Sequence, residues 1–278
     1  MVESLTTSAV EAIGADLFET IGTNFPVAAA SDEFYYFPQI QTGEGRWQIW
    51  DHFSESAVNA AVTDLQAGLA RLDKLSCEST GEASIDPDAA IEVSLMRKVT
   101  RTLIEQLTEV RAWQTQPTWH LTIACIGMAE ALESNVSDAG RHRAAGLAGF
   151  LDRAGRALKD VPVLFRDLGL EMVAGTRDYF LLLERRLPEL KPALTALDRF
   201  EETLHQLSLR DSYLLPRQLV ERIITSHLNC GRDTAAIEGL LDREIREVRR
   251  TIETITGETA TGRGLAAAIS ALPPPPVG

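Results

Sequence analysis

The sixteen-residue run 117–132, PTWHLTIACIGMAEAL, constrains the fold more than any other stretch of the chain. After its first four residues, only Thr122 and Glu130 are neither apolar nor glycine. Pro117 suits the first turn of a helix, because its missing N–H would be unpaired there anyway. A helix that is apolar on nearly every side has to be covered by other helices. The run therefore predicts a buried central helix, and it is too short for a bilayer, which needs about 20 apolar residues.

Helical periods also account for the rest of the chain. A helix is predicted from Asp51 to about Leu75, and another after the start signal Asp86-Pro87, with an apolar stripe at Ile91, Leu95, Val99, Leu103, Leu107 and Val110. The last helix carries apolar residues in steps of four, three, four and three between charged faces, which predicts an outer helix with a coiled-coil-like seam: Leu241, Ile245, Val248, Ile252 and Ile255.

The pattern as a whole predicts an all-α fold. No stretch of four or more residues favours a strand, and about nine or ten helices are expected around the central helix 117–132. One α-helical domain is predicted over 1–272. The four prolines from Pro273 force polyproline II, so 273–278 is interpreted as a linker or tail, and a chain that stops there looks cut short.

The net charge of the chain bears on its partners, and its N-terminus and cysteines bear on its compartment. The net charge of −13 argues against binding to nucleic acid or to an anionic membrane surface, because both would repel it. The chain begins without a basic segment followed by a long apolar one, so no signal peptide is expected. Cys77, Cys125 and Cys230 form no CxxC pair, and a reduced, cytoplasmic setting fits them best.

Four consecutive aromatic residues, Phe34 to Phe37, stand between Pro26 and Pro38 and cannot all face one core. One interpretation is an irregular segment that fixes the first helix to the bundle. The other is the aromatic wall of a cleft, with Tyr35 and Tyr36 as lining residues, since tyrosine combines an apolar ring with a polar tip.

The remaining candidates for a cleft are single residues. His120 opens the central helix beside Trp119, and His227 is the other histidine considered for a ligand-facing position. Arg217 follows Leu215-Pro216 and has the planar fork that binds carboxylates. In each case ordinary packing or a solvated helix start is the alternative interpretation.

Metal chemistry finds little support in local motifs. None of the five histidines belongs to an HExxH motif, in which two histidines hold zinc while the glutamate activates water. The spacing Glu202-x-x-His205 fits one half of a di-iron site, but no second copy accompanies it. We therefore predict no catalytic residue and no cofactor in this chain, and Glu202 and His205 are its candidates for a metal ligand.

Several segments resemble a known family. They are Phe34 to Gln39, Gln116 to Ile123 with Gly127, and the later rhythm Arg153 to Leu158 before Val161-Pro162. Their order resembles the N-terminal half of the bacterial proteins named domain of unknown function eight-eight-five. These proteins are large, all-helical and similar to zinc metallopeptidases of the gluzincin type.

The resemblance implies a metallopeptidase-like architecture whose zinc ligands lie beyond this chain. It implies that these residues form one wall of a cleft for a peptide-like or small-molecule substrate. The zinc-binding half would come from downstream sequence or from a partner chain. The alternative is a stand-alone helical scaffold or protein-interaction module without enzymatic activity, which the seam of the last helix favours.

Overall fold

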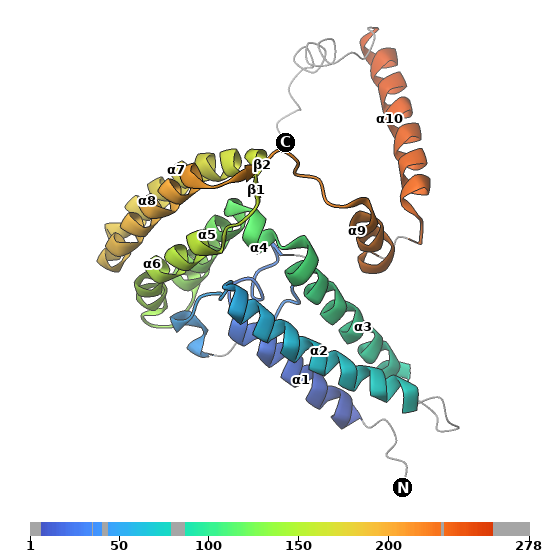
Figure 1. Ribbon diagram of the computed structural model, residues 1–278, viewed down its shortest axis with the longest axis horizontal. Coiled ribbons are helices and arrows are strands. Elements are labelled where there is room, and N and C mark those ends of the chain that lie inside the picture. Colours follow the sequence, from blue (N-terminus) through green and yellow to red (C-terminus); the bar gives the residue numbers. More distant parts are fainter. Residues whose placement is uncertain (1–6, 35, 41–43, 79–86, 229–230, 258–278) are drawn as a thin grey trace, which may run out of the picture. The chain divides into compact units, whose positions relative to one another are not determined.

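The computed structural model describes residues 7–34, 36–40, 44–78, 87–228 and 231–257. It confirms the predicted all-α fold, because the described residues are mostly helical and form only one two-stranded pairing of two residues per strand (Figure 1). The chain divides into two compact units, Met1–Leu215 and Pro216–Gly278, where the sequence predicted one domain over 1–272. Tyr35 and the predicted tail 273–278 lie outside the described residues.

The first unit begins with three helices that pack on one another. They are α1 (Thr7–Asn24), α2 (Glu55–Glu78) and α3 (Pro87–Glu105). Between α1 and α2 runs an irregular segment that contains the 3-10 turn η1 (Glu44–Gln48). A π-helical turn, η2 (Gln106–Val110), ends α3, and Arg111 follows it in the left-handed region at φ 53°. This turn changes the chain direction before the short α4 (Ala112–Thr115).

A second group of helices completes the first unit. It consists of α5 (Pro117–Glu133), α6 (Ala139–Ala157), α7 (Val163–Glu184), the 3-10 turn η3 (Pro188–Leu190) and α8 (Lys191–Gln206). Helix α5 packs against α6 and α7, and α8 packs against α6 and α7 in turn (Figure 1). The strands β1 (Val161–Pro162) and β2 (Leu209–Arg210) pair in parallel, and they join the two ends of the α7–α8 hairpin.

The second unit contains α9 (Arg217–Arg222), the π-helical turn η4 (Ile223–His227) and α10 (Thr234–Thr256). Both ends of α10 have caps. The Asp233 carboxylate accepts the Ala236 N–H at 2.8 Å, and Gly257 ends the helix at φ 69°, where a residue without Cβ is favoured. These caps satisfy backbone groups that would otherwise be exposed at the helix ends.

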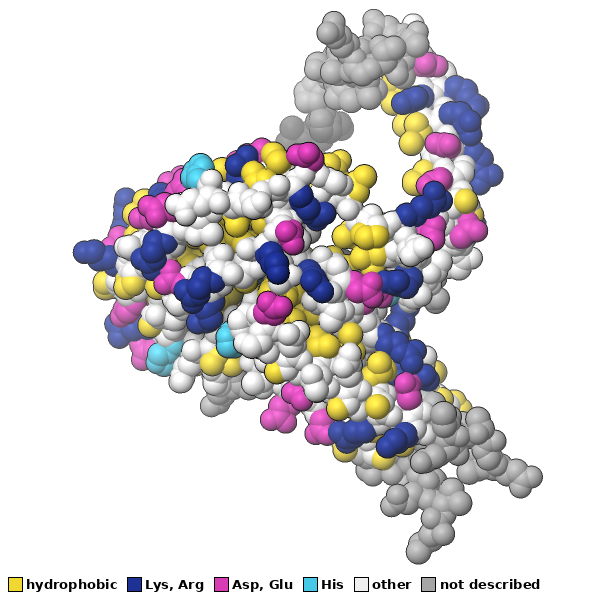
Figure 2. All heavy atoms as spheres, viewed as in Figure 1, with side chains coloured by type: hydrophobic (Ala, Val, Ile, Leu, Met, Phe, Trp, Pro, Cys, Tyr) yellow, Lys and Arg dark blue, Asp and Glu magenta, His cyan; other side chains and the backbone are white. Residues whose placement is uncertain are grey.

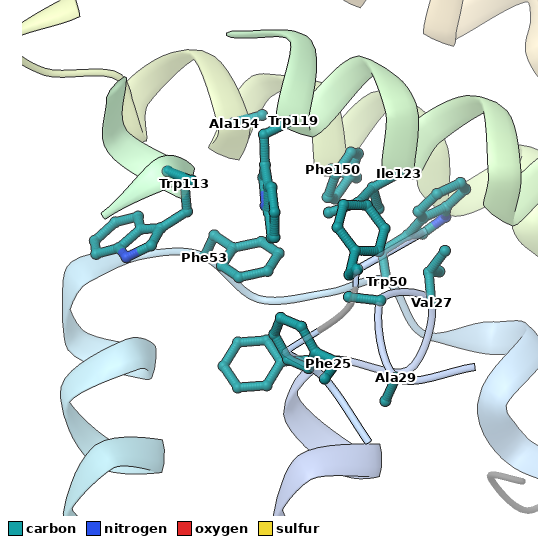
Figure 3. Packing of buried hydrophobic residues seen from close by; sticks show 14 of the residues in the cluster. Phe25, Val27, Ala29, Trp50, Phe53, Trp113, Trp119, Ile123, Phe150 and Ala154 are labelled. Carbon is teal, nitrogen blue, oxygen red and sulfur yellow. The ribbon is translucent and has the colours of Figure 1, made fainter. Parts of the chain in front are cut away.

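Helix α5 is the buried central helix that the sequence predicted. No residue between Pro117 and Ala131 is exposed, and Leu121, Ile123 and Met128 are fully buried. Aromatic side chains from earlier in the chain belong to the same core, as Figure 3 shows for Phe25 and Phe53 of the segments around α1 and α2 and for Trp113 of α4. One hydrophobic core thus connects the α1–α3 group with the α5–α8 group.

The predicted start of one helix was wrong, and the apolar stripe of another is buried only in part. The stripe on α3 is not a single buried face, because Ile91 and Leu95 are 58% and 56% exposed while Leu103 is buried. Three steps of four residues rotate about 120° around a helix with 3.6 residues per turn, so Ile91 and Leu103 face different sides. Helix α2 begins at Glu55, and Asp51 lies before it in the irregular segment.

Trp50 is held where α5 and α6 meet. A Cβ atom added to Gly127 of α5 would lie 2.7 Å from the Trp50 ring, and one added to Gly146 of α6 would lie 2.9 Å from it. The ring also stacks on Phe150 with centroids 5.0 Å apart (Figure 3). The two glycines therefore provide the space in which the irregular segment docks its tryptophan onto the second helix group.

Candidate functional site

Of the aromatic candidates that the structure describes, Trp119 lies in the core and Tyr36 packs against it. Trp119 is only 9% exposed, and Tyr36 stacks on it with ring centroids 5.6 Å apart and an interplanar angle of 5°. Phe34, Phe37 and Phe53 contact the same indole from other sides. The structure thus brings Tyr36 and Trp119 together as packing partners, and the segment that carries Tyr36 holds the first helix group to α5.

His120 is fully buried beside this aromatic group. Its Nε2 atom lies 2.7 Å from the carbonyl oxygen of Trp113, and its ring meets Phe53 and Phe150 edge to face. Burial lowers the pKa of His120 to about 4, and its hydrogen bond to Trp113 opposes the shift. A neutral imidazole that donates to a backbone carbonyl accounts for Nε2, while the buried Nδ1 atom makes no hydrogen bond within the described part of the chain.

The other candidates lie on surfaces. Glu202 and His205 are exposed on α8, and His227 is half-buried at the end of η4. Arg217 is exposed and pairs with Glu221, one turn further along α9, at 3.0 Å. Among the described residues, no group of three or more His, Cys, Asp or Glu side chains is placed to hold a metal ion.

Sequence reasoning missed a buried polar cluster around Arg143, which we call the Arg143 cluster: Trp47, Trp50, Asp51, Glu130 and Arg143. The Arg143 side chain is fully buried, and its guanidinium carbon lies 5.6 Å from the Trp47 ring centroid and 5.0 Å from that of Trp50. Its Nη1 atom donates to the carbonyl oxygen of Ile49. Planar stacking of this kind favours arginine over lysine.

Asp51 and Glu130 supply negative charge to the Arg143 cluster. The Oδ1 atom of Asp51 accepts the N–H groups of Val27 and Ala28 at 3.3 and 3.2 Å. Burial raises the pKa of Asp51 to about 7, although these hydrogen bonds and the charge of Arg143 act against the shift. Burial also raises the pKa of Glu130, against the opposing charges of Arg46 and Arg143.

Arg143 retains hydrogen-bonding capacity inside this cluster. Within the described part of the chain, its Nε and Nη2 atoms make no hydrogen bond, and neither does Oδ2 of Asp51. Burial lowers the pKa of Arg143 to about 10, so the guanidinium stays charged at neutral pH. Arg143 therefore holds a buried positive charge next to Trp50, and Asp51 holds a titratable proton in the same cluster. Because both groups are buried near the contact between α5 and α6, we expect substitutions in the cluster to change the stability of the fold.

The position of Arg143 could have been found from the helical period. Leu147, Phe150 and Ala154 of α6 follow it at steps of four, three and four and are all buried, so Arg143 lies on the core face. The burial of Asp51 could not have been found in this way, because the segment before α2 shows no helical period of apolar residues.

Each of the two units has a surface hollow among its described residues. One, of about 310 Å³, lies between α6 and α8, where Arg199 pairs with Asp152 at 2.8 Å beside Gly155 and Thr203. The other, of about 610 Å³, lies in the second unit and is lined by Arg217, among others. The Glu221 carboxylate, which also lines it, already bonds to Arg217 and lies 3.4 Å from the Thr234 hydroxyl. In both hollows the carboxylates present are engaged by residues of this chain.

Among the described residues of the second unit, exposed apolar side chains line the predicted seam of α10, in which Ile252 is half-buried. We call this surface the α10 seam: Leu241, Ile245, Val248, Ile252 and Ile255. Leu241, Ile245 and Val248 are 54%, 48% and 55% exposed, and Ile255 is 70% exposed. Figure 2 shows hydrophobic side chains along one edge of this helix and Lys and Arg side chains along another. The sequence prediction of an outer helix with an apolar seam agrees with these exposures.

No family model matches the chain, and neither a curated protein nor a solved structure is similar enough to it to count as a match. Within the described residues, no helix combines the length and the hydropathy that crossing a membrane requires. The fold and the surfaces described above are therefore the basis for a functional proposal.

Proposed function

We propose that this chain is an all-helical protein-interaction module whose binding surface is the α10 seam. The observation that carries the proposal is the exposure of four large apolar side chains on one face of a capped helix of 23 residues. Burial of apolar surface contributes about 25 cal/mol per Å², so a partner that covers these side chains gains stability.

The spacing of the seam indicates the kind of partner. Anchors at steps of three and four residues are those by which one helix packs against another or lies in an apolar groove. Monomeric proteins rarely leave large contiguous apolar patches exposed, and such patches commonly mark interaction surfaces. The first unit, with its large hydrophobic core, would then serve as the scaffold that carries α10.

Amide hydrogen exchange in α10 tests this proposal. A capped helix with an open apolar face exchanges rapidly, because little tertiary packing holds it. We expect rapid exchange in dilute full-length protein and slow exchange once a partner covers the seam. The contradicting result is slow amide exchange in α10 at every protein concentration, with the same slow rate in the Val248→Glu variant. It would mean that α10 is protected by contacts that do not involve an open seam, and the proposal would fail.

The resemblance supports a second proposal, in which this chain forms one wall of a metallopeptidase-like cleft in the cytoplasm. Downstream sequence or another chain would then supply an HExxH motif, the zinc ion and the catalytic groups. Extending the gene sequence past Gly278 tests it, since an in-frame or adjacent HExxH is expected. Turnover of a peptide library by this chain alone, with zinc added, would contradict the division into two halves.

A further inference from the structure

We infer that the partner of the α10 seam is α10 of a second copy of this chain, aligned parallel and in register. This inference rests on the proposed function and names its partner. In a two-stranded coiled coil, positions a and d of a seven-residue repeat form the apolar contact, and e and g flank it. The α10 seam fits this repeat with Ile245 and Ile252 at a and Leu241, Val248 and Ile255 at d.

The charges beside the seam complement each other across such a pair. Glu244 occupies position g and Arg249 occupies position e, five residues later. In a parallel coiled coil, residue g of one helix lies next to residue e five places further along the other helix. Glu244 of each copy therefore lies next to Arg249 of the other copy, and the two-fold symmetry of the dimer gives two such ion pairs.

An antiparallel pair fits the same residues less well. Placing Ile245 opposite Val248 of the other copy leaves Ile255 opposite Glu238, so a charge faces an apolar side chain. Shifting the register by one repeat places Ile245 opposite Ile255 but brings Arg249 next to its own copy, so like charges meet. The parallel alignment in register places each of the five seam residues opposite an apolar one and pairs Glu244 with Arg249. Its cost is that Glu238, at the preceding position a, faces its own copy beyond the end of the seam.

The structure of α10 suits a helix that is stabilised by association. Its side chains from Leu241 to Thr251 are all exposed, and both of its ends are capped by its own flanking residues. The arginines at the outer position f, Arg243 and Arg250, point away from the seam in this alignment, so they remain in solvent.

Sedimentation equilibrium of the full-length chain tests the inference. We expect a monomer–dimer equilibrium between about 1 and 300 μM, the affinity range of a short interface of roughly two repeats. Val248→Glu places a charge in the apolar contact and is expected to weaken the dimer about a hundredfold or more. Circular dichroism checks that each variant keeps its helix content.

A charge-exchange cycle tests the alignment. Glu244→Arg and Arg249→Glu each create two like-charge contacts in the parallel dimer, so each is expected to raise the dissociation constant about tenfold. The double variant with both substitutions restores opposite charges and is expected to return to the wild-type value. Arg243→Glu changes the net charge by the same amount as Arg249→Glu but lies at position f, so it serves as the matched control and leaves the dimer unchanged.

The other outcomes are distinct. A monomer at all concentrations overturns the inference; if α10 also exchanges rapidly there, the proposed function stands and the partner is a different protein. A dimer that survives Val248→Glu forms elsewhere on the molecule and overturns the inference. A dimer that Val248→Glu disrupts but that the double charge exchange does not restore overturns the parallel alignment.

Discussion

The indole Nε1 atom of Trp50 donates a hydrogen bond of 3.0 Å to the backbone carbonyl oxygen of Arg143, 93 residues further along the chain. The side chain of Arg143 in turn donates to the carbonyl oxygen of Ile49, next to Trp50. Two hydrogen bonds in opposite directions thus join the irregular segment to α6. Trp50 fits there because Gly127 and Gly146 leave space for its ring.

Gly146→Ala is expected to destabilise the protein by about 1–3 kcal/mol, because the new Cβ atom would lie 2.9 Å from the Trp50 ring and force it to move. The matched control is Gly175→Ala on α7, where nothing lies within 4 Å of the added atom. That variant should gain up to about 1 kcal/mol of helix propensity. Urea unfolding measures both, and equal effects would show that Trp50 is not tightly held.

Arg143→Lys is expected to cost about 2–4 kcal/mol, because an ammonium group cannot stack between Trp47 and Trp50 while it bonds to Ile49. Arg141→Lys, on the exposed side of the same helix, is the control and should change stability by less than about 0.5 kcal/mol. Thermal unfolding compares the two variants. A loss no larger than that of the control would mean that the stacking contributes nothing.

Asp51→Asn is expected to gain stability relative to the wild type as the pH rises from 4 to 7. The pKa of Asp51 is raised from 3.8 to about 7, so the folded wild type holds a proton that the unfolded chain has released over this range. The stability that comes from this proton is complete below pH 3.8 and is lost as the pH rises through 7, at most about 4 kcal/mol. Urea unfolding at several pH values measures the difference.

His120→Gln is expected to show the opposite trend, losing stability relative to the wild type as the pH rises from 4 to 6.5. The pKa of His120 is lowered from 6.5 to about 4, so the wild type's contribution is complete above pH 6.5 and is lost as the pH falls through 4. The difference is at most about 3 kcal/mol. His205→Gln, at an exposed position of α8, controls for the loss of a histidine. Parallel trends in both Asp51→Asn and His120→Gln would contradict these assignments.

Sequence periodicity predicted those parts of the fold in which the apolar pattern of a single helix determines which of its faces are buried. The apolar run of α5 required cover on all sides, and the steps of four and three in α10 indicated its seam. The period failed on α3, where a stripe in steps of four rotates around the helix, so that Ile91 is exposed and Leu103 is buried.

The parts of the candidate site that depend on distant contacts were not predictable in this way. Asp51 receives its hydrogen bonds from Val27 and Ala28, more than twenty residues earlier, in a segment without any period. The stacking of Tyr36 on Trp119 likewise depends on how an irregular segment folds back onto α5. The metallopeptidase resemblance and the cleft that it implies stay predictions.

The fit of Trp50 between Gly127 and Gly146 also bears on how such a chain can evolve. The Trp50 ring fills the space that the two glycines leave free. A larger residue at position 127 or 146 is therefore tolerated only after Trp50 has been replaced by a smaller residue. Among natural variants, the three positions should therefore change together, with a smaller residue at position 50 wherever position 127 or 146 has gained a side chain.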